Sequence, residues 1–563
     1  MKKIVILFIL LAFCAITSTA AEKRPYTIMI YMNGSDLESD FGLATDDLAE
    51  IIDSGLRSQN ANVIILTGGT RDWQVDEIPS YECIIWEFVD GKINELKSMG
   101  DVSMGNPATL RDFLQFSMQN YPAEKFGLIM WDHGGGSIVG FGHDENFNDD
   151  ALTLLDMKRA FDEAGLAQQK LEFLGFDACL MATVEMAIIA ADYAHVMIAS
   201  EDLEPGEGWD YTFLGVLNDT PRMDGFEFGK VIVDSFIDFF GPNSDEILTL
   251  SVVDLAQVKP VMEKMGRLME RAGAKISPYQ NTGLHRRDFF NLSKRRAVTK
   301  TFGEGSPRDN YADMVDIGNM AVMLHDLFPF EAESLLRALG NCVVYNRHNS
   351  DVDLYGLSSF YIFGGKSIGE SSLQIYSQLQ MDKNYTEYLH KFFQGITHIG
   401  GSESPIIHTE LALVQAVGEG HRLMGLLQTD TLGSYFWPKI NGYHVVMFPI
   451  ATTQNARLYA IPAMINDADV DIIVSFSARN PQGVILGSRE IVKALQKGYD
   501  PILTGDELTF FYPQWDADDN ETWQKGDTFR VGAVLGIEWV VDDVFELWHR
   551  VTDCCGYTRL VRR

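Results

Sequence analysis

Two short apolar runs that each end in a polar turn constrain the fold of this chain more than any other feature. Residues 171–176 lead into Asp177 and Cys179, and residues 126–131 lead into His133 and three glycines. Such runs are typical of buried parallel strands that feed helices. The turns after parallel strands lie at the carboxyl edge of the sheet, where open α/β folds bind ligands. We therefore expect His133 and Cys179 to lie close together, across the ends of two neighbouring strands.

The chain from residue 26 to residue 200 alternates between strand-like and helix-like segments. The predicted strands are 26–32, 62–66, 126–131, 171–176 and 195–200, and the predicted helices are 43–52, 107–121, 152–165 and 184–194. Residues 81–91 alternate apolar and polar positions, which predicts an antiparallel hairpin. Strands and helices that alternate in this way form a mostly parallel sheet covered by helices on both faces. The predicted fold class is therefore α/β.

The remainder of the chain changes character near residue 405. Helices near 225–240, 256–273 and 312–340, with strand-like pieces at 248–253 and 357–363, are expected to extend the same sheet and its helical layer. From about residue 410, helical periodicity is scarce and short β-type runs recur between turns. This spacing predicts an antiparallel β-sandwich or barrel. We expect an α/β domain over residues 25–405 and a β-rich, sandwich-like domain over residues 410–563.

The size and charge of the chain exclude some functions. Its 563 residues exceed one ordinary core of about 150 residues, so about two to four domains are expected. The net charge is −34, from 79 acidic and 45 basic residues. An acidic surface repels phosphate backbones, so we expect no nucleic-acid partner. A solvated surface explains this acidity most simply, and a preference for basic substrates is the alternative.

The amino terminus has the three parts of a secretory signal. Lys2 and Lys3 precede the almost wholly apolar residues 4–16, and small residues follow up to Ala20 and Ala21, where cleavage is expected. We therefore assign residues 1–20 to a signal peptide and expect a secreted, periplasmic or cell-surface protein. The apolar run is too short for a comfortable transmembrane span, and no other run approaches the necessary length. Because the bulky Phe13 precedes Cys14, lipid attachment is disfavoured.

Five cysteines remain after the signal peptide, and an odd count leaves at least one thiol outside any disulfide. Cys83 and Cys342 lie in apolar runs and are expected to be buried and inert. Cys554 and Cys555 are adjacent near the end of the chain and are compatible with either a bridge or the reduced state. Cys179 alone combines a polar turn with a candidate base.

The residues at the two predicted strand ends suit thiol chemistry. A cysteine nucleophile acts as its thiolate, which a nearby imidazole such as His133 promotes. The glycines after His133 allow close backbone approach, so the N–H groups of Gly134 and Cys179 are the candidate oxyanion donors. Asp177 is expected to share a side of the strand with Cys179, where a carboxylate suits a cationic substrate side chain. The alternatives are a buried structural cysteine, a histidine that caps a turn and a turn-capping aspartate.

Two metal-binding interpretations receive little support. A metal hydrolase would draw on His133, His143, Asp132 and Asp144, but no H-E-x-x-H or other tight ligand spacing is present. The acidic residues 516–521 resemble the start of a calcium loop, yet an EF-hand needs glycine where Glu521 stands. A solvated acidic turn is the simpler explanation of that segment.

Several motifs together resemble the clostripain family of cysteine peptidases, peptidase family C11 of the caspase-like clan. They are WDHGGG at 131–136, DACLMATVEMA at 177–187, YMNGSDLES at 31–39, EPGEGWDY at 204–211 and LSVVDLAQV at 250–258. The resemblance covers residues 25–400 and implies a caspase-like fold with a Cys-His dyad, His133 and Cys179. It implies cleavage of protein or peptide substrates after Arg or Lys, with Asp177 in the acidic primary pocket. It also implies that Glu207 contributes to the same pocket.

The chain departs from the family in the loop between the histidine and cysteine strands. Family members are commonly activated by autolytic cutting after a basic residue there, but residues 134–157 contain no Lys or Arg, and the first basic residues are Lys158 and Arg159. We expect an enzyme that needs no cut in that loop. No cofactor is expected, with calcium left open because parts of the family depend on it. The alternative function is an inactive caspase-like scaffold whose β-rich tail attaches to a surface or partner.

Overall fold

The computed structural model describes residues 23–241, 244–276, 283–297, 299–303, 313–363, 366–399, 406–411, 436–491, 497–515, 521–532, 535–541, 548–553 and 558–562. The predicted signal peptide, the adjacent Cys554 and Cys555, and residues 516–520 of the acidic run lie outside these ranges.

A nine-stranded sheet forms the centre of the amino-terminal part, in the order β13-β10-β9-β8-β5-β1-β2-β3-β4. The five central strands run parallel: β9 (Ala194–Ala199), β8 (Leu171–Asp177), β5 (Ala123–Trp131), β1 (Arg24–Asn33) and β2 (Ala61–Gly68). The antiparallel edges are β3 (Cys83–Val89) with β4 (Lys92–Gly100), and β10 (Thr249–Asp254) with β13 (Val343–His348). The mostly parallel sheet and the hairpin predicted from the sequence are therefore confirmed.

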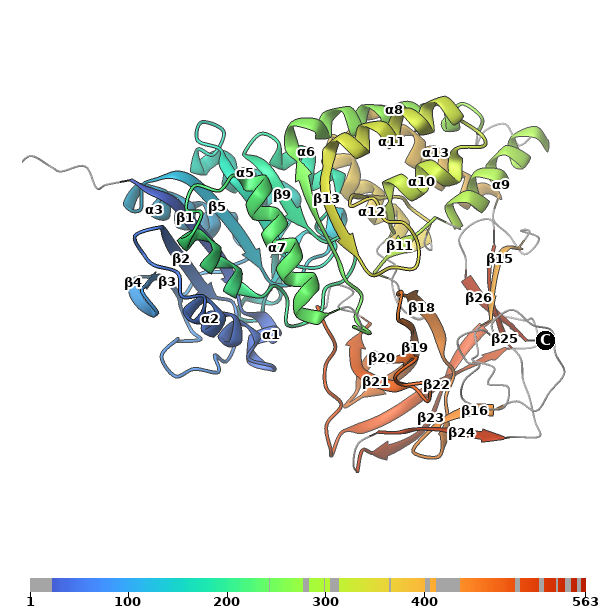
Figure 1. The fold of residues 1–563 in the computed structure, drawn as a ribbon. Helices are drawn as coiled ribbons and strands as arrows, with labels where there is room; N and C mark the ends of the chain where they lie inside the picture. The colour runs from blue at the N-terminus through green and yellow to red at the C-terminus, as the bar shows by residue number, and fades with distance from the viewer. Residues whose placement is uncertain are drawn as a thin grey trace, which may run out of the picture.

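Helices cover both faces of this sheet (Figure 1), which explains why its central strands are apolar on both sides. In β1, Met29 and Tyr31 belong to one core, whereas Ile28 and Ile30 belong to the other. The first core also receives α3 (Pro107–Asn120), α5 (Leu154–Ala164), α6 (Val184–Ala190), α8 (Val258–Gly273) and α11 (Pro329–Cys342). The second receives α2 (Leu43–Asp53), the 3₁₀ helix η2 (Tyr211–Asn218) and α7 (Gly225–Phe240). Cys83 and Cys342 are buried in this packing, as predicted.

The segment after residue 280 differs in detail from the sequence prediction. The predicted helix at 312–340 is two helices, α10 (Ile317–Leu324) and α11, and Pro329 begins the second one, where its missing N–H costs nothing. Three helices were not predicted: α9 (Gly283–Ala297), α12 (Lys366–Gln378) and α13 (Lys383–Ile399). The strand β14 (Ser358–Phe360) does not extend the main sheet but pairs with β12 (Met314–Asp316), which also pairs with β11 (Thr301–Phe302).

A β-rich region follows α13 and lies below the helical part in Figure 1. Its largest sheet is antiparallel and contains β18 (Phe448–Thr452), β19 (Ala456–Ile465), β20 (Ala468–Ser477), β21 (Val484–Glu490), β22 (Glu507–Trp515) and β23 (Glu521–Arg530). Smaller sheets are made by β16 (Phe436–Ile440), β17 (Tyr443–His444) and β24 (Ile537–Val541), and by β15 (Ile406–Leu411), β25 (Trp548–Asp553) and β26 (Thr558–Arg562). One apolar core joins the largest sheet to β16, with Ile440 packed among residues of β19, β20 and β22. This part confirms the predicted β-rich carboxyl-terminal region.

Candidate active site

The strands β5 and β8 are neighbours, and their carboxyl ends bring His133 and Cys179 into one site. Trp131 pairs with Asp177, and the Asp132 N–H donates to the Asp177 carbonyl at 3.3 Å. Beyond this pair the two turns touch, because a Cβ on Gly134 would lie only 1.9 Å from the Cys179 carbonyl oxygen. Gly134 therefore has to be glycine for the two backbones to approach. The structure thus brings together the residues that the sequence analysis singled out.

Cys179 lies in a closed environment. Its Sγ accepts a hydrogen bond from the Glu204 N–H at 3.2 Å, and burial raises the pKa of the thiol to about 12. The next residue, Leu180, has a φ of 60°, a conformation that is rare for a branched side chain and turns the chain sharply. Its N–H donates to the Asp202 carbonyl at 3.0 Å, which fixes the turn. In this state the thiol is rigidly held, protonated and shielded from water.

The imidazole of His133 is held on both of its nitrogens. Nε2 lies 2.7 Å from Oδ1 of Asp36, and Nδ1 accepts the Lys497 N–H at 2.9 Å. Because Nδ1 accepts, Nε2 carries the proton and donates it to Asp36, so the carboxylate selects the tautomer. The neighbouring Asp132 serves the loop instead: it accepts the His143 N–H at 2.7 Å, and burial raises its pKa to about 7.

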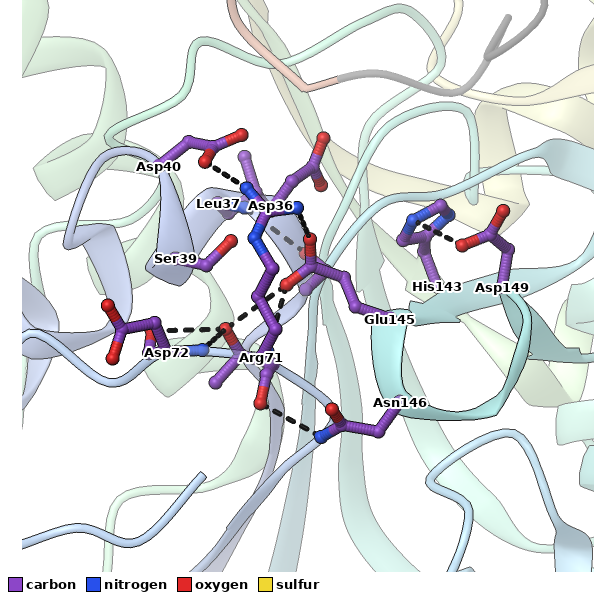
Figure 2. Close-up of polar contacts among 12 residues, drawn as sticks. Asp36, Leu37, Ser39, Asp40, Arg71, Asp72, His143, Glu145, Asn146 and Asp149 are labelled. Atoms are coloured by element: carbon purple, nitrogen blue, oxygen red, sulfur yellow. Dashed lines mark hydrogen bonds and ion pairs between the residues drawn. The ribbon is translucent and has the colours of Figure 1, made fainter. Parts of the chain in front are cut away.

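Asp36 belongs to the short helix α1 (Ser35–Ser39), which a polar network fastens to the loop after His133 (Figure 2). Arg71 bonds to Asp40 next to α1, and its Nη1 lies 2.5 Å from Oε1 of Glu145 in the 3₁₀ helix η1 (Glu145–Phe147). His143 in β6 (Phe141–Asp144) lies with Nε2 3.1 Å from Asp149 (Figure 2). The Arg71 side chain is 56% exposed, so these ion pairs add little stability. Their effect is to fix where α1 presents Asp36.

A lysine side chain fills the space beside Asp177. The Nζ of Lys497 bonds to Oδ1 of Asp177 and lies 3.8 Å from Oε2 of Glu204. The ammonium also sits 5.5 Å from the ring centre of Trp131, a favourable place for a cation. The second oxygen of Asp177 accepts from two further groups, the N–H of Trp209 at 3.3 Å and the hydroxyl of Tyr211 at 3.1 Å.

More acidic than basic side chains lie around Lys497. Burial raises the pKa of both Asp47 and Glu204 well above their usual range, and Lys497 partly offsets this for each of them. Burial alone would lower the pKa of Lys497, but the attraction of Asp177 and then Glu204 outweighs it and the net shift is upward. Three carboxyl groups thus surround a single cation. Such an enclosure stabilises the charged form of Lys497.

Glu207, the second acidic position suggested by the family resemblance, does not face this lysine. Its side chain is exposed, and its charge acts on Glu246 instead. The carboxylate of that loop which does face Lys497 is Glu204, three residues earlier. Gly208 explains the difference, because its φ of 64° turns the loop, and a Cβ there would lie 2.4 Å from the Lys497 Nζ. The glutamate of this motif that lies at the buried lysine is therefore Glu204 and not Glu207.

Two other residues of the site were missed from the sequence, Asp36 and Lys497. Asp36 lies in the YMNGSDLES motif, whose acidic residue after a strand was the available signal. Lys497 lies 320 residues from its partner Asp177 and has no local signal. In the described ranges, no group of three or more His, Cys, Asp or Glu side chains is placed to hold a metal ion.

Comparisons with known proteins show the family of this chain. The model of the clostripain family matches residues 30–395. The chain belongs to the clostripain family. A curated relative, clostripain of Hathewaya histolytica, is 26% identical over 228 residues, which is 34% of this chain and 42% of that protein. The chain thus spans less than half the length of the relative it matches.

Solved structures of C11 proteases are also similar to this clostripain-family chain. A secreted C11 cysteine protease from Bacteroides thetaiotaomicron, in complex with an irreversible peptide inhibitor, has a TM-score of 0.48 and 14% identity. The matched region covers 64% of this chain and 98% of the protease chain. An inactive zymogen C11 protease from Parabacteroides distasonis has a TM-score of 0.48 and 17% identity, covering 65% of this chain and 99% of its own.

Proposed function

We propose that this protein is a cysteine endopeptidase that hydrolyses peptide bonds after lysine or arginine. Membership of the clostripain family supports peptidase chemistry in general. One observation carries the preference for lysine or arginine. The side chain of Lys497 pairs with Asp177, which lies in the same turn as Cys179. A buried carboxylate that accepts a cation contributes far more to binding than an exposed pair. Asp177, supported by Glu204, is therefore the proposed acidic group at the bottom of the primary specificity pocket.

In the proposed mechanism His133 and Cys179 form the catalytic dyad and Asp36 positions the imidazole. Nδ1 of His133 takes the thiol proton as Sγ of Cys179 attacks the substrate carbonyl carbon. The N–H groups of Gly134 and Cys179 donate to the oxygen that becomes negative. The imidazolium then gives its proton to the leaving amine, which leaves a thioester on the enzyme. Water, deprotonated by the same imidazole, hydrolyses the thioester and regenerates the thiol.

We propose further that the protein acts outside the cytoplasm on protein or peptide substrates. The two lysines, the apolar run and the small residues at the amino terminus support export. Within the described residues, none of the helices has the length and apolar character that a membrane crossing requires. We expect no cofactor, and a chelator tests for calcium dependence, since residues 516–520 are outside the described ranges.

A fluorogenic peptide panel tests this function. The peptides differ only at the residue before the scissile bond, which is Arg, Lys, Asp, Asn or Leu, and they are offered to the wild type and to Cys179→Ala with and without chelator. Cleavage after Arg or Lys that disappears in Cys179→Ala is the expected result. Cleavage after Asp or Asn would overturn the role of Asp177. If no peptide is cleaved even by the variants described in the next subsection, the protein is a caspase-like scaffold.

A further inference from the structure

A segment of the β-rich region, residues 497–500, lies inside the candidate active site. Lys497 is fully buried there, with its ammonium on Asp177 and its backbone N–H on Nδ1 of His133. Gly498 follows with its N–H on the Glu204 carbonyl at 3.0 Å. Gly498 also packs against the backbone of Gly206, because a Cβ at Gly498 would lie 2.7 Å from the Gly206 Cα. The segment therefore contacts both catalytic turns and the loop that carries Glu204.

Three groups that a substrate would use are engaged by this segment: the Asp177 carboxylate, Nδ1 of His133 and the Glu204 carbonyl. The Lys497 ammonium forms an ion pair with the Asp177 carboxylate, and the Lys497 backbone N–H donates a hydrogen bond to Nδ1 of His133. A bound peptide would form a backbone hydrogen bond with the Glu204 carbonyl, and this carbonyl instead accepts the Gly498 N–H. Cys179 is fully buried. An external peptide and residues 497–500 exclude each other.

The segment is bound in an orientation that does not lead to its own hydrolysis. Cleavage after Lys497 requires the imidazole to protonate the nitrogen of Gly498, which is the leaving amine of that bond. His133 instead faces the nitrogen of Lys497, while the nitrogen of Gly498 points to Glu204. The lysine side chain is accepted as a substrate side chain would be, but the peptide bond after it is not presented to the acid. The contact is that of an inhibitor.

The β-rich region holds the segment in place. Asp500 forms two backbone hydrogen bonds with Ser488 of β21, at 2.8 and 2.7 Å. Tyr499 packs against a small apolar cluster that includes Leu458 of β19, and Ile247 of the α/β part packs against the same cluster. The segment is therefore anchored on its carboxyl-terminal side by the sheet that follows the peptidase fold.

We propose that residues 497–500 are an internal pseudosubstrate and that the β-rich region is an inhibitory module that keeps the peptidase latent. This proposal rests on the proposed function, because it assigns Lys497 to the specificity pocket of that enzyme. It gives the β-rich region a role and agrees with the absence of Lys and Arg from residues 134–157. Activity requires displacement of Lys497 rather than a cut in that loop.

Four variants separate inhibition from a merely structural contact. Lys497→Met keeps the length of the side chain but removes its charge, so Asp177 loses its partner and the segment is released. Lys497→Arg keeps the charge and is expected to stay inhibited. Gly498→Val leaves Lys497 intact but forces a side chain against Gly206 from a backbone with φ of 70°. Lys525→Met is the matched control, because Lys525 lies on β23 near Met464, away from the site.

Two readouts are measured on these full-length variants and on the wild type. The first is kcat/KM for a peptide with lysine before the scissile bond. The second is the rate at which iodoacetamide alkylates Cys179, followed by peptide mass spectrometry, which needs no substrate. An effective concentration on the order of 1 mM for the tethered segment, against an affinity of about 10–100 μM typical of KM values, predicts a roughly 10- to 100-fold rise. Both readouts are expected to rise in Lys497→Met and Gly498→Val, but not in Lys497→Arg or Lys525→Met.

The outcomes distinguish this proposal from the function on which it rests. Wild-type cleavage and alkylation rates in both Lys497→Met and Gly498→Val, with peptide cleavage present, would overturn the inhibitory role and leave the peptidase standing. Faster alkylation without cleavage of any peptide would support the block but overturn the proposed function. Self-cleavage of the wild type after Lys497, seen in its intact mass, would overturn the non-reactive orientation.

Discussion

Replacing Asp177 by asparagine removes the negative charge that the structure places under a bound lysine. Both oxygens of this carboxylate are engaged, one by the Lys497 ammonium and the other by the Trp209 N–H and the Tyr211 hydroxyl. The side chain is fully buried, so water does not screen the pair. Removing one partner of such a pair costs about 2–5 kcal/mol. At about 1.36 kcal/mol per tenfold, this is roughly a 30- to 5,000-fold loss in kcat/KM.

The matched control is Glu204→Gln. Glu204 also approaches the ammonium, at 3.8 Å, but burial raises its pKa well above the usual range and so favours its neutral form. Exchanging a neutral acid for an amide should change kcat/KM by less than about tenfold, or about 1.4 kcal/mol. Two substrates are compared in the Lys497→Met background, one with lysine and one with leucine before the scissile bond. Asp177→Asn should lower the lysine rate selectively, whereas an equal loss for both peptides would refute a charge-based pocket.

Three further predictions concern neighbouring groups. Asp36→Asn removes the carboxylate that selects the imidazole tautomer, so kcat should fall about 10- to 100-fold with little change in KM; an unchanged kcat in steady-state assays would contradict this role. Gly134→Ala places a Cβ 1.9 Å from the Cys179 carbonyl, and it should destabilise the protein by about 1–3 kcal/mol in denaturant unfolding. Burial raises the pKa of Asp316 to about 6 and that of its partner Glu201 well above its usual range. Because the folded state binds these protons more tightly, the pair stabilises the protein at low pH, and this stabilisation is lost as the pH rises through about 6. The melting temperature of Glu201→Gln, measured relative to wild type, should therefore rise between pH 5 and 8.

The parts of the site that the sequence predicted are those encoded by local pattern. An apolar run followed by a polar turn is enough to place His133 and Cys179 at strand ends, and parallel pairing of neighbouring strands does the rest. Gly134 follows from the same turn, since only glycine allows the backbone contact with Cys179. The mostly parallel sheet was predictable for the same reason, because continuous apolar strands separated by helices leave few alternatives.

The parts that the sequence did not predict depend on loop conformation or on contacts between distant segments. Whether Glu204 or Glu207 faces the site is decided by a left-handed turn at Gly208, which no periodicity reveals. Asp36 lies in a five-residue helix, too short for an amphipathic pattern. Lys497 reaches Asp177 only because the β-rich region packs against the α/β part. Local sequence patterns do not predict such contacts between distant segments.

Active-site labelling tests the central claim, a Cys179 peptidase with a carboxylate pocket for lysine, most directly. The Lys497→Met variant is treated with two short peptides that carry a thiol-reactive ketone, one ending in lysine and the other in leucine, and the modified residue is located by mass spectrometry. We predict rapid modification of Cys179 by the lysine reagent, slow modification by the leucine reagent, and loss of this difference in Asp177→Asn. Equal labelling by both reagents, or labelling at a cysteine other than Cys179, would contradict the account.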